Sequence, residues 1–287
     1  MIEYLMFYKY QLLVGGVLGA ACAVLGVFVL LQRQTLFAAT MSQAGVLAFA
    51  LVLLGSEALI PETGTHASSA AGVTAATNWA VLLLNILLML PFYFLRRRGV
   101  TNLDATLVAG IAVFSAAAQV LTVVGGLHTH LLTAYFGNIL TVGVRDLVST
   151  AAVVLPGAAG FCLIYRSLVS LSFDRDHARL SGIAVGRVDF LFFAILGATA
   201  ALTIRLMGSF YTLGHLVVPA LFALAWTRSL RAALPVAALY SVLATVGGFC
   251  VSLLPISIGG QTFNLPTSSV IVILLVIGCA PLLLRRS

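Results

Sequence analysis

The sequence contains very little charge. Only 8% of its 287 residues are Asp, Glu, Lys or Arg, whereas 61% are hydrophobic and the mean hydropathy is +1.14. A soluble domain carries about 25% charged residues, so this composition excludes a soluble fold. The apolar runs are long and uninterrupted, which favours spanning helices over barrel strands, because barrel strands alternate in hydrophobicity over about 10 residues. The composition therefore predicts an all-α polytopic membrane protein.

The sequence also lacks the motifs of several enzyme classes. It has no G-x-x-x-x-G-K-[ST] phosphate loop, no G-x-S-x-G nucleophile elbow and no H-E-x-x-H zinc motif. The four cysteines, Cys22, Cys162, Cys250 and Cys279, stand singly inside apolar runs, without metal-site or disulfide spacing. We therefore predict a non-enzymatic chain with no ATP site and no permanently bound cofactor, in which the cysteines serve packing.

The apolar segments predict eight or nine membrane spans, the segment 209–226 being the least regular. The candidate spans are 11–31, 41–56, 78–95, 104–124, 147–165, 188–204, 209–226, 232–254 and 267–284. We expect a polar outer loop at 57–77. Small residues such as Gly15 and Gly19 on the first span, and Gly247 and Gly248 later, favour close helix packing.

The basic residues are divided unequally between the two sides of these spans. The larger group is Arg33, Arg96, Arg97, Arg98, Arg166, Arg175, Arg179, Arg187, Arg228, Arg231, Arg285 and Arg286, and the smaller group is Lys9, Arg145 and Arg205. The positive-inside rule then places the N-terminus outside and the C-terminus in the cytoplasm. The net charge of +7 reflects this topology, with no nucleic-acid partner expected, and 96–98 is interpreted as an anchor that contacts membrane lipid headgroups.

The longest polar interruption of the second half is 172–187. Asp174 stands at an N-cap position, Ala178 and Leu180 favour helix, and Gly182 stands where such a helix would end. We predict a short amphipathic helix at the cytoplasmic membrane surface. Because a simple connection needs only a few residues, we expect this segment to contact a partner.

This segment resembles the coupling helix of the membrane subunits of bacterial ABC importers for zinc, manganese and iron(II). Their segment has the form Phe-Asp-Pro-Glu-x-Ala-x-x-x-Gly, and Phe173, Asp174, Ala178 and Gly182 match it in register, with Arg175 and Asp176 in place of Pro-Glu.

Three further stretches carry the same resemblance, in order along nearly the whole chain. They are 135–140 (similar to Leu-Phe-Gly-x-x-Leu), 207–220 (similar to Val-Gly-x-x-Leu…Leu-Leu-x-x-Pro-Ala) and 265–269 (similar to Leu-Pro-x-Gly-Ala).

The resemblance implies a single permease domain over 1–287, in a bacterial inner membrane, that moves a divalent transition metal, zinc or manganese. It implies three protein partners: a second copy of the chain, an extracytoplasmic solute-binding protein and a cytoplasmic ATP-binding subunit. The ATP-binding subunit would dock on the coupling segment 172–187. The expected coupling residues are Phe173, Asp174, Arg175, Asp176, His177, Ala178 and Gly182.

One departure from the family concerns the transport path. Family members show Gly-Asp-x-x-x-His-Ala after the first span, where Asp and His resemble a metal-coordinating pair, but this chain has Ala39 and Gln43 at those positions. An alanine offers no ligand and an amide is a weak one for first-row metals. The identity of the cargo therefore stays open.

Six other residues are candidates for the path: His215, Pro219, His128, His130, Glu62 and His66. His215 lies in an apolar span before Pro219 and could replace a missing ligand, because an ionisable residue in a membrane usually faces a cavity or partner. Alternatively, it is a neutral histidine bonded to a carbonyl that Pro219 frees. His128 and His130 at an outer end could capture metal, and Glu62 and His66 in the outer loop could add ligands; the alternative for these four is a solvated loop.

Two alternatives for function remain. The same ABC architecture could move a metal chelate or another small solute, for which coordinating side chains are unnecessary. The chain could instead be a stand-alone secondary carrier, which usually needs an acidic or histidine relay within its spans. Asp104 and His215 are the candidate members of such a relay.

Overall fold

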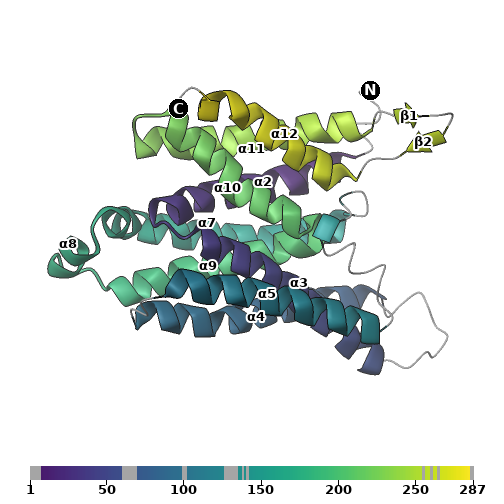
Figure 1. Ribbon diagram of the computed structural model, residues 1–287, viewed down its shortest axis with the longest axis horizontal. Helices are drawn as coiled ribbons and strands as arrows, with labels where there is room; N and C mark the ends of the chain where they lie inside the picture. Colours follow the sequence, from purple (N-terminus) through teal and green to yellow (C-terminus); the bar gives the residue numbers. More distant parts are fainter. Residues whose placement is uncertain are drawn as a thin grey trace.

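The protein is a bundle of long helices that run along one common direction (Figure 1). The structure, a computed structural model, describes residues 8–59, 70–98, 102–125, 135–137, 139, 142–253, 256–258, 261–263 and 266–284. Its helices are α2 (Lys9–Leu31), α3 (Thr35–Leu59), α4 (Ala70–Arg97), α5 (Leu103–Val124), α7 (Val144–Phe173), α8 (Arg175–Leu180), α9 (Val185–Met207), α10 (Ser209–Trp226), α11 (Leu230–Ser252) and α12 (Thr267–Leu284).

The predicted all-α membrane architecture is confirmed. Within the described ranges, eight helices are long and apolar enough to cross a membrane, and a ninth apolar stretch, Thr267–Ala280, is shorter. A two-stranded antiparallel hairpin, β1 (Ile256–Ile258) with β2 (Gln261–Phe263), adds to the predicted helices, and Ser257 pairs with Thr262. The hairpin lies at the end of the bundle opposite α8 (Figure 1).

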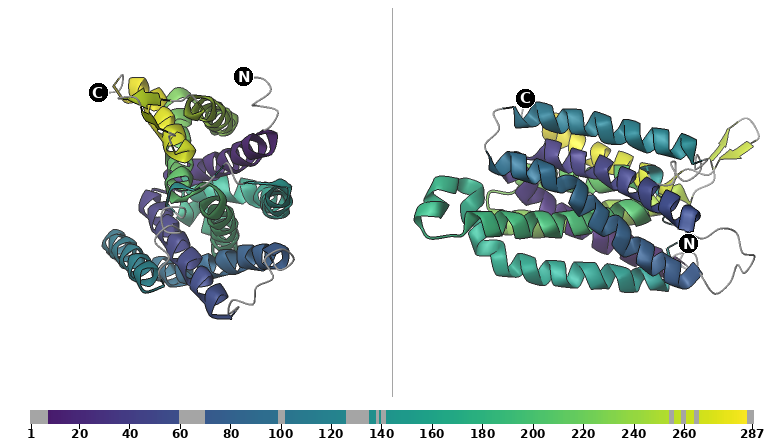
Figure 2. Two further views of the ribbon diagram at one scale, coloured as in Figure 1. Left: turned by 90° about the vertical axis from the view of Figure 1, so that its right-hand side faces the viewer. Right: turned by 90° about the horizontal axis from the view of Figure 1, so that it is seen from below.

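The helices form two neighbouring groups, which the end-on view separates (Figure 2, left). In one group α2 packs against α10 and α11, and α12 covers α10 and α11. In the other group α3 packs against α4 and α5, and α9 packs against α4 and α7. Contacts of α10 with α3 and α9 join the two groups.

Three helix boundaries differ from the predicted ones by more than three residues. α3 begins at Thr35 rather than near 41, α4 begins at Ala70 inside the predicted 57–77 loop, and α7 continues to Phe173, beyond the predicted end near 165. Apolar windows end at the first polar residues, whereas the helical backbone continues through them. In the last turns of α7, the hydroxyls of Ser170 and Ser172 donate to the carbonyls of residues four positions earlier, so these polar side chains are satisfied within the helix.

Close backbone contact holds α2 against α10. A side chain at Gly26 would overlap the carbonyl of Leu216, and one at Gly19 would lie within 2.9 Å of the side chains of Tyr211, His215 and Ser241. Because lipid is as apolar as the helices, association in a membrane depends on such close packing rather than on hydrophobic burial. The predicted small-residue face of the first span is therefore confirmed at Gly19.

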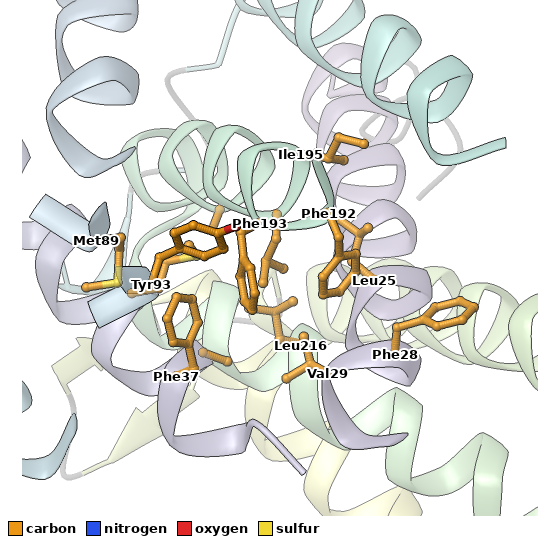
Figure 3. Packing of buried hydrophobic residues seen from close by; sticks show 14 of the residues in the cluster. Leu25, Phe28, Val29, Phe37, Met89, Tyr93, Phe192, Phe193, Ile195 and Leu216 are labelled. Atoms are coloured by element: carbon orange, nitrogen blue, oxygen red, sulfur yellow. The ribbon is translucent and has the colours of Figure 1, made fainter. Parts of the chain in front are cut away.

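The largest cluster of buried side chains lies where α2, α3, α4 and α9 meet (Figure 3). The rings of Phe37 and Phe193 have their centroids 4.6 Å apart, and Tyr93 lies 5.7 Å from Phe193 in an edge-to-face arrangement. Aromatic pairs of this geometry add roughly 0.5–1.5 kcal/mol beyond their contact area. This cluster packs α4 against α9.

Candidate functional site

α8 is a short helix of six residues, Arg175–Leu180, and both of its ends are capped. The Oδ1 atom of Asp174 accepts hydrogen bonds from the backbone N–H groups of Asp176 (2.9 Å) and His177 (3.0 Å), as its predicted N-cap position requires. These bonds hold the pKa of the Asp174 carboxyl below its usual value. The carboxylate therefore fixes the first turn of the helix in its ionised form.

The other end of α8 closes with a Schellman motif. The N–H of Gly182 donates to the carbonyl of Arg179 (3.1 Å), and the N–H of Ile183 donates to the carbonyl of Ala178 (3.1 Å). Gly182 has φ +77°, in the left-handed region that favours glycine. The predicted helix stop is confirmed, but the helix covers only 175–180, because Phe173 belongs to α7 and Val185 begins α9.

α8 projects past the ends of the long helices (Figure 1; Figure 2, right). Phe173 is 72% exposed and Leu180 is 89% exposed, although both are large and apolar. Asp174, Asp176 and His177 are also exposed. Exposed apolar side chains beside charged ones are typical of a surface that another protein covers. The sequence analysis identified four of these five residues and did not single out Leu180 as a contact.

The opposite face of α8 is attached to the bundle. Ala178 is fully buried, and the guanidinium Nη2 of Arg175 contacts both carboxylate oxygens of Asp189 on α9, at 2.9 and 3.1 Å. Arg96 of α4 approaches the same carboxylate at 3.9 Å. Of the predicted coupling residues, Arg175 and Ala178 thus hold the helix in place rather than face outward.

Asp189 is a residue of this attachment that sequence reasoning missed. It lies in the first turns of a spanning helix, where its side chain is only 11% exposed. The available signal was its charge, because Asp189 is one of only eight acidic residues in the chain and follows Arg187 by two positions. Arg96 was predicted as a surface anchor, but its side chain is only 10% exposed.

A hydrogen-bonded chain extends this attachment to the α2–α3 connection. The Gln32 side-chain oxygen accepts from Arg96 Nη2 (3.3 Å) and from Gln34 Nε2 (3.0 Å), and Gln32 Nε2 donates to the Ser172 hydroxyl (3.4 Å). Side chains from α4, from the end of α7 and from the α2–α3 connection therefore meet at one end of the bundle.

The Gln43 position in α3 already has protein partners. Its side-chain oxygen accepts hydrogen bonds from the hydroxyls of Ser115 on α5 (3.0 Å) and Tyr135 (3.4 Å). The side chain of Ala39, one helical turn earlier, contributes no polar atom. Sequence reasoning missed Ser115 because a serine in an apolar span gives no distinctive signal.

His215 lies in a different hydrogen-bond network. Its Nδ1 is 3.0 Å from the Tyr211 carbonyl and its Nε2 is 3.1 Å from the Thr245 hydroxyl, while the ring stacks on Tyr211 at 3.8 Å. The residue is fully buried. Both ring nitrogens therefore have partners within the chain, and the carbonyl is that of Tyr211 rather than the one freed by Pro219, which lies buried later in α10. A role of His215 or Pro219 in transport stays a prediction.

Two of the stretches that carry the family resemblance touch each other. Gly137 (φ +70°) lies directly against the backbone of Met207 and Gly208 (φ +92°), so that a side chain at either glycine would overlap the other segment. The ring of Tyr135 lies 5.7 Å from that of Phe210. The segment 135–137 is therefore held against the α9–α10 junction by backbone contact.

The remaining metal-ligand candidates, Glu62, His66, His128 and His130, lie outside the described residues. Within the ranges that the structure describes, no group of three or more His, Cys, Asp or Glu side chains could hold a metal ion.

Comparison with known proteins gives consistent results. Residues 4–282 match the family described as the ABC 3 transport family. The chain is 24% identical over 246 residues to the high-affinity zinc uptake system membrane protein ZnuB of Haemophilus influenzae, covering 84% of this chain and 86% of that protein. It is 22% identical over 256 residues to the manganese transport system membrane protein MntC of Halalkalibacterium halodurans, covering 88% and 82%.

The fold is similar to that in the solved structure of PsaBC from Streptococcus pneumoniae in complex with Fab. The TM-score is 0.79 at 19% sequence identity, and the match covers 98% of this chain and 93% of that chain.

Proposed function

The chain belongs to the ABC 3 transport family, and from that premise we propose that it is the membrane permease of an ATP-driven importer of zinc or manganese. Relatives along most of its length are named zinc and manganese transport membrane proteins, which supports this cargo. The observation that carries the proposal is α8, a capped helix that projects from one end of the bundle, with the exposed Leu180 on the helix and the exposed Phe173 at the end of α7 just before it.

A separate cytoplasmic ATP-binding subunit docks on this exposed face and hydrolyses the ATP. When it closes on ATP it pushes α8, and the ion pair of Arg175 with Asp189 transmits the push to α9. Because α9 packs against α4 and α7, the motion passes into the bundle as a rigid-body displacement. A second copy of the chain completes the pathway, and an extracytoplasmic binding protein delivers the cargo at the opposite end, which is the outer side if α8 is cytoplasmic.

The coupling step is tested with the whole transporter reconstituted in vesicles. Asp174→Ala and Gly182→Ala remove the two caps of α8, so we expect uptake to fall while ATP hydrolysis continues. Arg231→Gln, an exposed arginine on α11 away from α8, is the matched control and should leave both rates unchanged. Uptake that is unchanged in both cap variants would rule out α8 as the coupling element.

The cargo is tested by the elemental content of cells that lack the chain, compared with complemented cells, in metal-poor medium. A selective fall in zinc or manganese that complementation restores is the expected result. An unchanged content of every metal, with the ATP-binding subunit still co-purifying with the tagged chain, would contradict the metal assignment but leave the ABC architecture intact.

One observation favours a second candidate, a permease for a metal chelate. The Gln43 oxygen already accepts hydrogen bonds from Ser115 and Tyr135, and Ala39 has no ligand atom. A chelate brings its own ligands and needs hydrogen-bonding partners rather than bare coordination. Under this alternative, uptake of the free ion would be slow and uptake of the chelated ion fast, and Gln43→Ala would slow the latter.

A further inference from the structure

A polar cavity of about 460 Å³ opens between α4, α8 and α9. Its lining residues are Tyr93, Arg96, Arg175, Arg179, Val185, Gly186 and Asp189. The exposed Phe173 and Leu180 are not among its lining residues, whereas Arg175 and Asp189, which pair α8 with α9, are. The cavity therefore belongs to the attachment of α8 rather than to its outer face.

The cavity has more positive than negative charge. Three guanidinium groups line it, but only the Asp189 carboxylate faces them from its wall. Arg175 takes both oxygens of that carboxylate, and Arg179 is paired at 3.4 Å with Asp176, outside the lining. Arg96 is left with the carboxylate at 3.9 Å, which exceeds hydrogen-bonding distance.

Arg96 is an incompletely satisfied buried cation. Its side chain is only 10% exposed, and its Nη1 atom donates no hydrogen bond within the part of the chain that the structure describes. Its other contacts are Nη2 to Gln32 (3.3 Å) and the Phe193 ring, whose centroid lies 4.8 Å from the guanidinium carbon. Leaving a buried charged donor without an acceptor costs free energy. An anionic oxygen beside Arg96 Nη1 would remove this cost.

An apolar groove of about 630 Å³ continues from this cavity along α4 and α9. The two share Tyr93, Val185 and Gly186, and the groove adds Phe94, Phe190 and Leu191, with Arg187 at its rim. Phe94 and Phe190 are 50% and 51% exposed. The cationic cavity is therefore continuous with an apolar groove on the surface of two membrane-spanning helices.

We propose that the pocket and groove together form a binding site for one anionic phospholipid. The phosphate oxygens of its headgroup accept from Arg96 and Arg179, and an acyl chain lies in the groove between α4 and α9. Basic pockets between spanning helices are suited to anionic headgroups. A soluble phosphate would use only the first half of the site, whereas the amphipathic shape matches a lipid.

The bound lipid would form part of the attachment of α8. Its phosphate would lie among side chains of α4, α8 and α9, the three elements that the Asp189 carboxylate also joins. The inference concerns lipid binding by the chain itself and is independent of the cargo and of ATP coupling.

The test measures lipid adducts on the full chain in mild detergent by native mass spectrometry. Phosphatidylglycerol and phosphatidylcholine are added in turn, with inorganic phosphate as competitor. We expect retention of phosphatidylglycerol over phosphatidylcholine, and a loss of about five-fold for each of Arg96→Gln and Arg179→Gln. Arg231→Gln should retain phosphatidylglycerol as the unchanged chain does, and Phe190→Ser should weaken retention of both lipids.

Three outcomes would overturn the proposal. They are equal retention of the two lipids, equal loss in Arg231→Gln and Arg179→Gln, or displacement of phosphatidylglycerol by inorganic phosphate together with no effect of Phe190→Ser. The last result would identify a site for soluble phosphate instead. If Arg96→Gln does not fold, Arg179→Gln decides alone, because that side chain is 64% exposed and its loss leaves the core intact.

Discussion

The α8 end of the bundle and the interior around Gln43 and His215 are both polar regions of an apolar protein, but they are built differently. Charged groups hold the α8 end, where Arg175 and Arg96 surround the Asp189 carboxylate. Neutral hydrogen bonds hold the interior, where hydroxyl and carbonyl groups satisfy Gln43 and His215. A charge in the bilayer centre is costly, whereas one near the headgroups is tolerated. This cost explains why the ion-paired attachment of α8 lies at an end of the bundle, whereas neutral groups satisfy Gln43 and His215.

The largest expected effect is at the charged end. Asp189→Asn removes the only carboxylate that faces Arg96 and Arg175 in the cavity, so we expect the free energy of unfolding to fall by about 3 kcal/mol. Asp176→Asn is the matched control, because that carboxylate is 87% exposed and its pairing with Arg179 contributes about 0.5 kcal/mol. Denaturant unfolding in detergent measures both variants. Equal losses would mean that the buried pair contributes no more than the exposed one.

In the interior, the corresponding test disrupts a backbone contact instead of removing a charge. Gly137→Ala would have to adopt φ +70° and would overlap Met207, so we expect a loss of about 2 kcal/mol. Gly182→Ala has a similar φ of +77° but open space around it, so strain alone should cost about 1 kcal/mol.

The difference between these two variants, measured by the same unfolding assay, isolates the overlap between the segments 135–137 and 207–208. If Gly182→Ala were the more destabilising of the two, the backbone contact at the α9–α10 junction would not be a major source of stability.

A smaller effect is expected at Gln43. Gln43→Leu leaves the hydroxyls of Ser115 and Tyr135 without their acceptor, which should cost about 1 kcal/mol. Tyr135→Phe removes only the longer of the two bonds, at 3.4 Å, and should cost less. Raising the ionic strength should leave both differences unchanged, since neither bond involves a charge. A marked salt dependence would show that a charge acts in this region.

The smallest effect concerns pH at α8. The pKa of Asp174 is lowered by the N–H groups of His177 and Asp176. The ionised Asp174 therefore stabilises α8 fully above the pKa of an aspartate in the unfolded chain, which is about 4. This stabilisation is lost as the pH falls through the lower pKa of Asp174 in the folded protein. We expect a nitroxide at Leu180→Cys, with Cys162 and Cys250 replaced by serine, to keep its mobility from about pH 8 to 4 and to loosen below that range. Asp174→Asn should remove this transition, and a transition that persists in that variant would show that the Asp174 carboxylate does not control it.

The sequence predicted the caps of α8 and most of the spans, because these depend on local chemistry. An N-cap carboxylate, a left-handed glycine and an apolar run each act within a few residues along the chain. The family resemblance likewise rested on short motifs, and residues 4–282 match that family. Helix ends were predicted less well, as α7 shows by continuing through Ser170 and Ser172, because polar residues can be satisfied inside a helix.

By itself the sequence determined that this is a helical membrane protein with a capped polar helix at the end that carries most of the basic residues. Only the tertiary structure decided which polar groups meet. Arg175 and Asp189 are 14 positions apart, Arg96 and Gln32 are 64 apart, and Gln43 and Ser115 are 72 apart. Such pairings depend on how helices pack and rotate against one another, and that geometry is set by distant contacts such as Gly26 on Leu216 and Gly137 on Met207, which no local pattern encodes.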